Sequence, residues 1–348
     1  MSEKSSPPGR RPTLRMVAER AGVSTATVSY VFSGRAGAPS GRGVAEATAA
    51  RVLQAAGELH YRPNRAARAI RTGRTGTVQL ALHMLSDPWS LAVADAVNEE
   101  ANRHGLTTLI LADGDWYTSL NRLECDVVYL DGVDAGPQTR AKLQGLVDRG
   151  QRMVVFSDAL EPSGFDVVRS NPLPGAAIAM DHLLQRHTRI GALVAETAVE
   201  ASALERTRYT VYTERMAAAG LDIAPGWTST FGTTQASAYH AAVRLLQQDD
   251  RPSAIYATTD FAGIAAINAA HMLGLRVPQD VAVIGLGSTP DAQTVRPSLT
   301  TVGPIDFYAQ QARIIVDRAV EGHLSPARLH EFAWSLVPGD STRLEQGV

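Results

Sequence analysis

A run of small, mostly hydroxyl-bearing side chains stands close to the N-terminus, where the spacing predicts a short helix from residue 25 to about 32. Ser24 can cap that helix, because its hydroxyl accepts an otherwise unpaired backbone N–H. Val28 and Val31 are three residues apart and would face inward. The outer surface and its margins are then formed by Thr25, Ala26, Thr27, Ser29 and Tyr30. Groups of these types contact phosphates and the edges of bases.

A second short helix is needed to hold this one in place, and the preceding residues predict it. Thr13 can cap the helix, and Gly22 can end it in the left-handed conformation. Its apolar stripe at helical spacing consists of Val17, Ala18 and Ala21. Helix, glycine-containing turn and helix form the motif that lays its second helix in a DNA major groove. An ordinary helical hairpin is the alternative interpretation.

A third helix is expected from about residue 45 to 60. One apolar face would be formed by Ala49, Val52, Leu53, Ala56 and Leu59. Packed on the first two helices, this face closes a small three-helix core. A core of this size is only marginally stable alone.

A short arginine-rich segment follows the third helix. Arg65, Arg68 and Arg71 are three residues apart, and Ile70 is the one large apolar side chain among them. So short a helix should fray in water, but a DNA minor groove could order it with Ile70 wedged between base steps. A linker with incidental arginines is the alternative.

Charge is unevenly distributed along the chain. Thirteen basic and four acidic residues up to position 75 give +9, so residues 76–348 carry −11 of the total of −2. A basic head of this kind suits a polyanion, to which binding depends on salt through counterion release.

The rest of the composition excludes several classes of protein. Cys125 is the only cysteine, so neither an intrachain disulfide nor a cysteine metal cluster can form. Residues 1–12 lack the apolar core of a signal peptide and are expected to be a disordered tail, and no run of 18 apolar residues occurs. No G-x-S-x-G, P-loop or H-E-x-x-H motif is present. We therefore expect a cytoplasmic protein with no enzyme activity, cofactor, metal or membrane contact.

After residue 76, short apolar runs alternate with amphipathic helical stretches, which is typical of parallel sheets covered by helices. Strands are expected at 77–82, 107–111, 127–130, 153–156, 190–194, 227–231, 254–256 and 281–286. Helices are expected at 92–104, 139–149, 176–185, 204–219, 235–246 and 261–273. Two such series give two doubly wound α/β lobes, with a cleft for a small ligand at the strand ends.

The N-terminal segments TLRMVAERAGVSTATVSYVFSG, VAEATAARVLQAAGELHYRPN and RPNRAARAI together resemble the lactose-repressor (LacI/GalR) family of transcription regulators. The resemblance implies that Thr25, Ala26 and Tyr30 read bases, and that Ile70 stands where the family has an intercalating Leu. Phosphate contacts are implied for Thr13, Ser24, Thr27 and Ser29. The remaining candidate DNA-binding residues are Arg15, Asn64, Arg65 and Arg68.

The resemblance continues through the body in ATTDFAGIAAINAAHMLGLRVPQDVAVIGLGSTPDAQTVRPSLTTV and WSLVPGDST. It implies a two-lobed, periplasmic-binding-protein-like fold in which the chain crosses between lobes. The expected domains are a tail (1–12), a helix-turn-helix head (13–61), a hinge (62–76) and an effector-binding and dimerisation body (77–344). Within the body, the N-lobe would span 77–172 and 303–329, and the C-lobe 173–302 and 330–344. The segment 113–125 is shorter than in the family, so its helix should be stunted.

By the same resemblance, five residues are candidates for effector binding: Trp89, Asn171, Arg206, Thr233 and Asp260. Arg206 matches the family's ligand-binding arginine, although a surface arginine is the alternative. Asp260 either faces the ligand or caps the helix that starts at 261. Trp89 either stacks on a ring of the ligand or packs between helices.

The expected cleft departs from the family pattern. Gly287 stands where a carboxylate is usual, Asn171 where an Asp is frequent, and Thr233 where an aromatic often stacks on a sugar. We therefore expect an unusual effector, sugar-like or a related metabolite, or none.

The expected function is repression by a homodimer that binds a pseudo-palindromic operator and is switched by the effector. The alternative is an effector-independent architectural DNA-binding protein with a degenerate cleft. A sugar-processing enzyme is disfavoured, because the sequence offers no acid/base or nucleophile pair.

Overall fold

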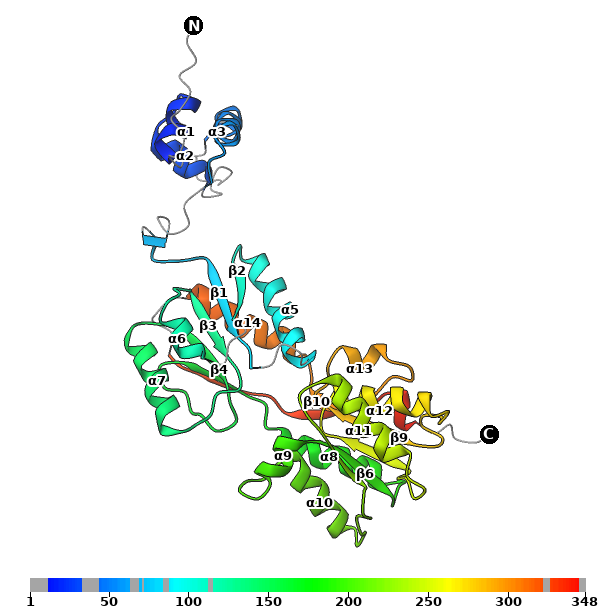
Figure 1. The fold of residues 1–348 in the computed structure, drawn as a ribbon. Coiled ribbons are helices and arrows are strands. Elements are labelled where there is room, and N and C mark those ends of the chain that lie inside the picture. The colour runs from blue at the N-terminus through cyan, green and yellow to red at the C-terminus, as the bar shows by residue number, and fades with distance from the viewer. Residues whose placement is uncertain are drawn as a thin grey trace. The chain divides into compact units, whose positions relative to one another are not determined.

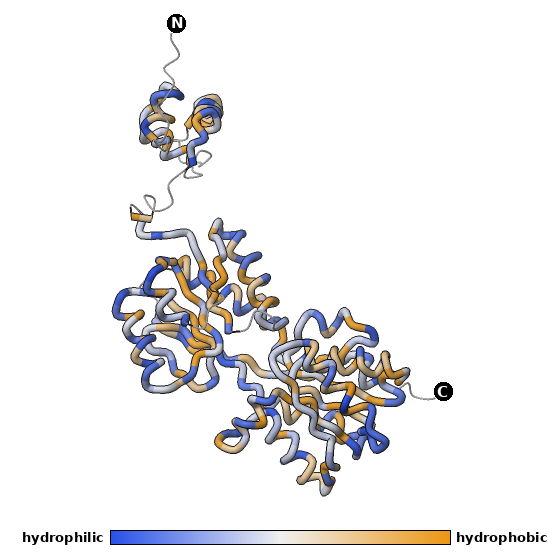
Figure 2. The backbone as a smooth tube through the Cα atoms, in the orientation of Figure 1, coloured by the Kyte–Doolittle hydropathy of each residue, from blue (hydrophilic) through white to orange (hydrophobic). Residues whose placement is uncertain are grey.

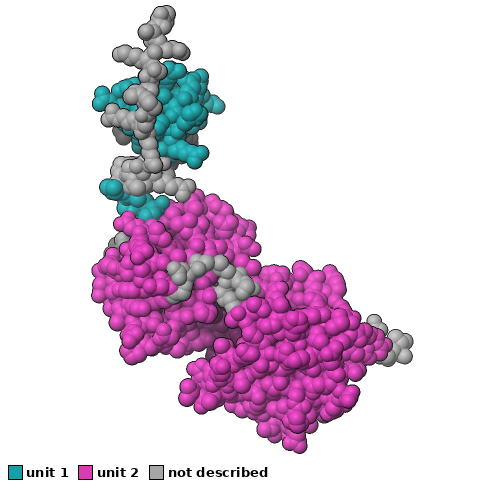
Figure 3. Space-filling model, viewed as in Figure 1, with its two compact units in different colours: residues 1–75 teal, residues 76–348 magenta. Residues whose placement is uncertain are grey.

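The computed structural model describes residues 12–32, 44–62, 69–70, 72–83, 88–111, 115–321 and 326–343. The chain divides into two compact units, Met1–Thr75 and Gly76–Val348, coloured separately in Figure 3. Within the described residues, no helix is long and apolar enough to cross a lipid bilayer.

Among its described residues, the first unit contains the helices α1 (Leu14–Ala21), α2 (Thr25–Phe32) and α3 (Glu46–Glu58) (Figure 1). Val17, Val28 and Val52, one from each helix, are fully buried against one another. The predicted helix ends are confirmed: Thr13 Oγ1 accepts the Met16 N–H at 3.3 Å, and Gly22 ends α1 with φ +65°. The third helix is rotated slightly from expectation, because Leu53 is 55% exposed and Ala55 is buried instead.

The second unit begins with a six-stranded parallel sheet in the order β11-β5-β4-β3-β1-β2. Its strands are β1 (Thr77–Ala81), β2 (Thr107–Leu111), β3 (Val127–Leu130), β4 (Met153–Phe156), β5 (Asp166–Arg169) and β11 (Leu329–Glu331). One face is covered by α5 (Pro88–Arg103) and α14 (Phe307–Glu321), and the other by α6 (Trp116–Leu120) and α7 (Pro137–Asp148). The five residues of α6 confirm the stunted helix.

A second six-stranded sheet has the order β12-β10-β9-β8-β6-β7 and is parallel except for its antiparallel edge strand β12. Its strands are β6 (Ile190–Ala195), β7 (Thr228–Phe231), β8 (Ala254–Ala257), β9 (Ala282–Leu286), β10 (Thr300–Pro304) and β12 (Trp334–Val337). Helices α8 (Pro172–Leu184) and α10 (Arg208–Ala218) cover one face, and α11 (Gln235–Leu246) and α12 (Asp260–Met272) cover the other. Shorter elements are α9 (Glu196–Ala201), α13 (Asp291–Thr294) and the 3-10 turn η2 (Asp340–Thr342).

Burial on both faces explains the composition of the central strands. All four residues of β3 and of β8 are buried, and the hydrophobic colour in Figure 2 runs along the strands of both lobes. Strands covered on both faces are expected to be continuous hydrophobic runs rather than alternating ones.

The chain crosses between the lobes three times: from β5 into α8, from β10 into α14, and from β11 into β12 (Figure 1). This confirms the two-lobed fold. Leu329–Glu331 pairs wholly in the first sheet and Thr300–Pro304 in the second, so the expected boundaries at 303 and 330 fall inside strands.

Candidate DNA-binding surface and ligand cleft

The second helix of the head presents its polar residues as the sequence predicts. Thr25 and Ala26 are exposed, and Thr27, Ser29 and Tyr30 are half-buried. Ser24 Oγ accepts the Thr27 N–H at 3.1 Å and lies 2.9 Å from Thr27 Oγ1. The two hydroxyls predicted to contact phosphate are thus held together at the start of α2.

Two arginines of the first helix have carboxylate partners. Arg15, a predicted DNA-binding residue, donates to Glu19 at 2.9 Å, and both side chains are largely exposed. Arg20 donates to Glu58 on α3 at 2.9 Å, and this hydrogen bond lowers the pKa of Glu58. Arg20 therefore ties α1 to α3, whereas the exposed Arg15 pair is weak enough for a phosphate to replace Glu19.

The predicted hinge contacts are only partly described. Asn64, Arg65 and Arg68 lie outside the described residues. Ile70 lies within them, and its side chain is 89% exposed. A large aliphatic side chain in this position is open to a partner.

A cavity of about 250 Å³ lies between the two lobes of the body, where Figure 3 shows the surface hollowed. The first lobe contributes His83, Pro88, Trp89, Ser90, Asp131, Gly132 and Phe156; the second contributes Arg208, Thr259, Asp260, Phe261, Leu286, Gly287 and Thr289. The crossovers contribute Ser170 and Trp334. The wall is therefore rich in aromatic rings, with a small number of charged and hydroxyl groups.

Trp89 packs against other aromatic side chains and also lines the cavity. Its ring lies 4.9 Å from the ring of Phe156 and 5.8 Å from that of Phe307, and Trp89 also lines the cavity. The indole is thus fixed by aromatic neighbours before any ligand arrives.

The prediction that Arg206 lies in the cleft is wrong. Arg206 is 63% exposed, pairs with Glu214 at 2.6 Å and does not line the cavity. Helix α10 starts four residues later than residue 204, because Thr207 caps it by accepting the Thr210 N–H. The cavity arginine is therefore Arg208, the first residue of that helix.

Arg208 is firmly positioned. Its Nη1 donates to the Thr258 carbonyl at 2.7 Å, and its guanidinium carbon lies 5.2 Å from the centre of the Trp334 ring. Trp334 in turn has a buried indole N–H with no acceptor among the described residues. The Trp334 ring therefore supports the Arg208 guanidinium in the wall of the cavity.

Asp260 reaches the cavity, but its oxygens are already used. Oδ2 accepts the Thr289 N–H at 2.6 Å and the Thr289 hydroxyl at 3.0 Å, and Oδ1 accepts the Thr301 hydroxyl at 2.5 Å. The alternative of a capping role is wrong, since Thr259 caps α12. Burial raises the pKa of Asp260, and the three hydrogen bonds oppose that shift.

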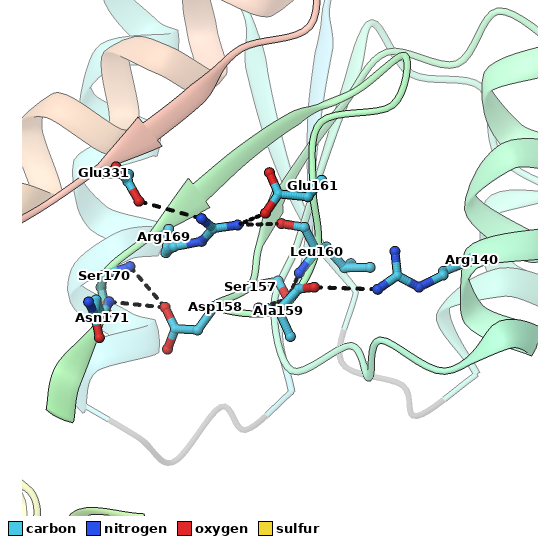
Figure 4. A network of polar contacts seen from close by, with 10 residues as sticks. All are labelled: Arg140, Ser157, Asp158, Ala159, Leu160, Glu161, Arg169, Ser170, Asn171 and Glu331. Atoms are coloured by element: carbon cyan, nitrogen blue, oxygen red, sulfur yellow. Dashed lines mark hydrogen bonds and ion pairs between the residues drawn. The ribbon is translucent and has the colours of Figure 1, made fainter. Parts of the chain in front are cut away.

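Asn171 and Thr233 are not among the residues that line the cavity, contrary to expectation. Thr233 is exposed. Asn171 has φ +41°, and its backbone N–H, with that of Ser170, donates to Asp158 Oδ1 (Figure 4). Asn171 therefore shapes a crossover rather than the wall.

A neighbouring network fixes two crossover strands together. In Figure 4, Arg169 on β5 points between Glu161 and Glu331, the last residue of β11. Its Nη2 also donates to the Leu160 carbonyl at 2.8 Å. Arg169 therefore links β5 to β11 where the chain leaves the first lobe after each of these strands.

Sequence reasoning missed further wall residues. Asp131, which is 8% exposed, accepts the His83 N–H at 2.5 Å. The only available signal was the position of Asp131 directly after the buried run of β3, since ligands bind at the carboxyl ends of parallel strands.

A helix-turn-helix head with a two-lobed cleft body defines a DNA-binding regulator with a ligand-binding domain. The family model for bacterial regulatory proteins of the lacI family matches residues 13–64, and that for periplasmic binding protein-like domains matches residues 180–342. The HTH-type transcriptional repressor PurR of Edwardsiella ictaluri (strain 93-146) is 32% identical over 303 residues, covering 83% of this chain and 84% of that protein. PurR of Yersinia pestis bv. Antiqua (strain Antiqua) is 31% identical over 329 residues, covering 90% and 92%. The chain therefore belongs to the LacI family.

Solved structures agree with this fold. The lac repressor dimer bound to operator and the anti-inducer ONPF aligns with a TM-score of 0.69 at 20% identity, covering 96% of this chain and 99% of that one. A complex of the transcriptional regulator CelR with cellobiose aligns with a TM-score of 0.59 at 26% identity, covering 95% and 100%. The protein is a DNA-binding transcriptional repressor of this family and not an enzyme.

Proposed function

We propose that this protein is a cytoplasmic homodimeric repressor that binds a pseudo-palindromic operator and is switched by a small ligand in the cleft. The head (13–61) binds DNA, the hinge (62–76) contacts the minor groove, and the body (77–344) binds the effector and dimerises. The observation that carries the effector switch is Arg208, which is held in the cavity wall between the lobes by the Thr258 carbonyl and the Trp334 ring. Its guanidinium presents a fork of N–H donors suited to an acceptor on a ligand.

The ligand chemistry follows from the wall. Trp89, Phe156 and Phe261 offer aromatic faces, and Arg208 offers a charged fork of donors. Asp260 already accepts three hydrogen bonds from Thr289 and Thr301, which leaves little acceptor capacity for a row of hydroxyls. We infer a ligand with a flat or ring-shaped body and at least one strong acceptor, such as a carboxylate or carbonyl. A ring-shaped ligand is consistent with the solved complex of the similar regulator CelR with cellobiose.

An effector-independent architectural role is the second candidate. The departures from the family pattern at Gly287 and Thr233 favour it, but a cavity of about 250 Å³ lined by Arg208 and aromatic side chains opposes it. Calorimetry of the full-length protein against a metabolite panel, with and without bound DNA, distinguishes the two. Absence of heat with every compound and with cell extract fractions would favour the architectural role.

The DNA contacts are tested by selecting bound sequences from a random DNA pool. Tyr30→Ala should change the selected consensus, because Tyr30 is proposed to read bases with Thr25 and Ala26. Arg15→Ala should instead weaken all sequences alike, by about 1 kcal/mol and less at high salt, because it removes a phosphate contact. Thr13, Ser24, Thr27 and Ser29 are proposed to act like Arg15, and Asn64, Arg65, Arg68 and Ile70 to contact the minor groove. An unchanged consensus for Tyr30→Ala would contradict this placement of α2.

The homodimer is proposed to form along the free edge of the first sheet. Leu109 and Ile110 on edge strand β2 are nearly half exposed, and so is Leu91 on the adjacent helix α5. An exposed apolar edge strand is a template for pairing with another chain.

Replacing both Leu109 and Ile110 with lysine should raise the dimer dissociation constant about tenfold or more, because the proposed interface would lose two apolar side chains and gain two charges. Operator affinity should fall with it, because two linked heads bind more tightly than one. Sedimentation velocity measures the first effect. Leu204→Lys, at a leucine that is 93% exposed, is the matched control. A double variant that remains dimeric would place the interface elsewhere.

A further inference from the structure

We propose that a second cavity, where α8 ends against the segment after β12, binds a small oxyanion such as inorganic phosphate. This cavity measures about 190 Å³ and shares no lining residue with the cleft. Its wall consists of His182, Leu183, Gln185, Arg186, His187, Thr300, Pro338, Gly339, Thr342 and Arg343. Nothing in the proposed effector switch depends on it.

The charge of this wall is all of one sign. Two arginines and two histidines line the cavity, and no Asp or Glu is among the lining residues. Burial lowers the pKa of both His182 and His187, and the charge of Arg186 lowers both further. The imidazoles are therefore neutral near pH 7, and the two arginines carry the charge. A bound anion would balance a cluster that the protein does not balance from within this wall.

The arginines retain hydrogen-bond donors for such an anion. Among the described residues, Arg186 forms no ion pair. Arg343 pairs with Asp340 at 3.3 Å, but both side chains are more than half exposed. Asp340 Oδ2 also accepts the Ser298 hydroxyl at 2.9 Å. An exposed pair of this length contributes little, and a guanidinium has five N–H donors, so an anion can engage Arg343 alongside Asp340.

The opposite wall is rigid. Gly339 N–H donates to Thr300 Oγ1 at 3.1 Å, and the Thr300 hydroxyl donates to the Gly339 carbonyl at 3.0 Å. The Ser341 hydroxyl donates to the Val283 carbonyl at 2.6 Å. A Cβ at Gly339 would lie 2.5 Å from the carbonyl carbon of Leu299, so the two backbones touch directly. The segment after β12 is thereby fastened to β10, and the cavity is preformed.

Hydrogen bonds also fix the orientation of the two imidazole rings. His182 Nε2 lies 2.9 Å from Thr342 Oγ1, and His187 Nδ1 lies 3.2 Å from Ser253 Oγ. The Ser253 hydroxyl donates to the Arg189 carbonyl, and the Thr300 hydroxyl donates to the Gly339 carbonyl, so His187 Nδ1 and His182 Nε2 are the donors in these contacts. The remaining nitrogen of each neutral ring is an acceptor, so the donors for an anion come from the two arginines.

One feature of the fold opposes an anion. The cavity adjoins the C-terminal end of α8, where the helix dipole places partial negative charge. The backbone N–H groups of Arg186 and His187 both donate to the backbone carbonyl of Leu183, so this carbonyl at the helix end is already paired. We therefore expect modest affinity, with a dissociation constant on the order of 1 mM.

The test is titration of the full-length protein with inorganic phosphate by calorimetry, at constant ionic strength. The double variant Arg186→Gln/Arg343→Gln should bind at least about tenfold more weakly, because two charge-assisted contacts are lost. Arg189→Gln is the matched control: Arg189 is an exposed neighbour that pairs with Asp250 and does not line the cavity. Arg208→Gln should also leave phosphate binding unchanged, which separates this site from the cleft.

A local readout identifies the site, because the basic head can also attract phosphate. The imidazole NMR signals of His182 and His187, assigned with His182→Gln and His187→Gln, should shift with the dissociation constant found by calorimetry. Phosphate binding that leaves both signals unmoved would overturn the proposal. Equal affinity in the double variant, or no binding by the wild type, would overturn it as well.

Discussion

Arg208→Gln should weaken effector binding about 10- to 100-fold, whereas Arg206→Gln should leave it within about twofold. The two arginines are separated by one residue, but only Arg208 lines the cavity, while Arg206 pairs with Glu214 at the surface. A hydrogen bond to a charged group contributes about 1.5–3 kcal/mol, which gives the expected loss.

The measurement is ligand-induced thermal stabilisation across a metabolite panel, followed by calorimetry of the compounds that stabilise the wild type. Arg208→Gln should lose the stabilisation that these compounds give. A full response in Arg208→Gln, with native circular dichroism, would mean that the effector does not use this cavity.

Val28→Asp should abolish operator binding while leaving the body folded. Val28 is fully buried in a head whose core is formed by the few apolar residues of three short helices. An unpaired carboxylate there costs several kcal/mol, comparable to the whole stability of so small a unit. Because the body has its own cores, its unfolding transition and ligand response should persist.

Operator affinity is measured by fluorescence anisotropy with a selected DNA sequence, and the body is followed by calorimetric unfolding. Ala47→Asp adds the same charge at an exposed position of α3 and is the matched control. It should bind DNA within a few-fold of the wild type. Loss of the body's transition in Val28→Asp would show that the two units do not unfold independently.

The head could be predicted almost entirely from local sequence. Thr13, Ser24 and Gly22 mark helix ends through contacts that span three or four residues, and these contacts are present in the structure. Valines at helical spacing predicted the buried face. Leu53 was assigned to the wrong side, because Ala55 satisfies the same periodicity and the packing of α1 against α3 decides between them.

The residues of the cleft were predicted less well. They were assigned from the resemblance to the family, and the sequence does not show which side chains are in contact in the fold. Arg206 and Arg208 both lie near the expected start of the same helix. Because Thr207 caps this helix, Arg208 is its first residue and Arg206 lies outside it. Asp260 lies beside the cavity as expected, but Thr289 and Thr301, 29 and 41 residues away, use its oxygens. Asn171 lies on a crossover, where Asp158 fixes the backbone.

The sequence by itself determined the class of protein: a basic three-helix head and an acidic body of alternating strands and helices. These features depend on capping, periodicity and charge, which act between residues close in the chain. Only the tertiary structure showed the pairing of β11 with β5 and of β12 with β10, and hence which side chains meet between the lobes. The first pairing joins residues 162 positions apart and the second joins residues 30 to 36 positions apart, and a strand carries no local mark of its partner.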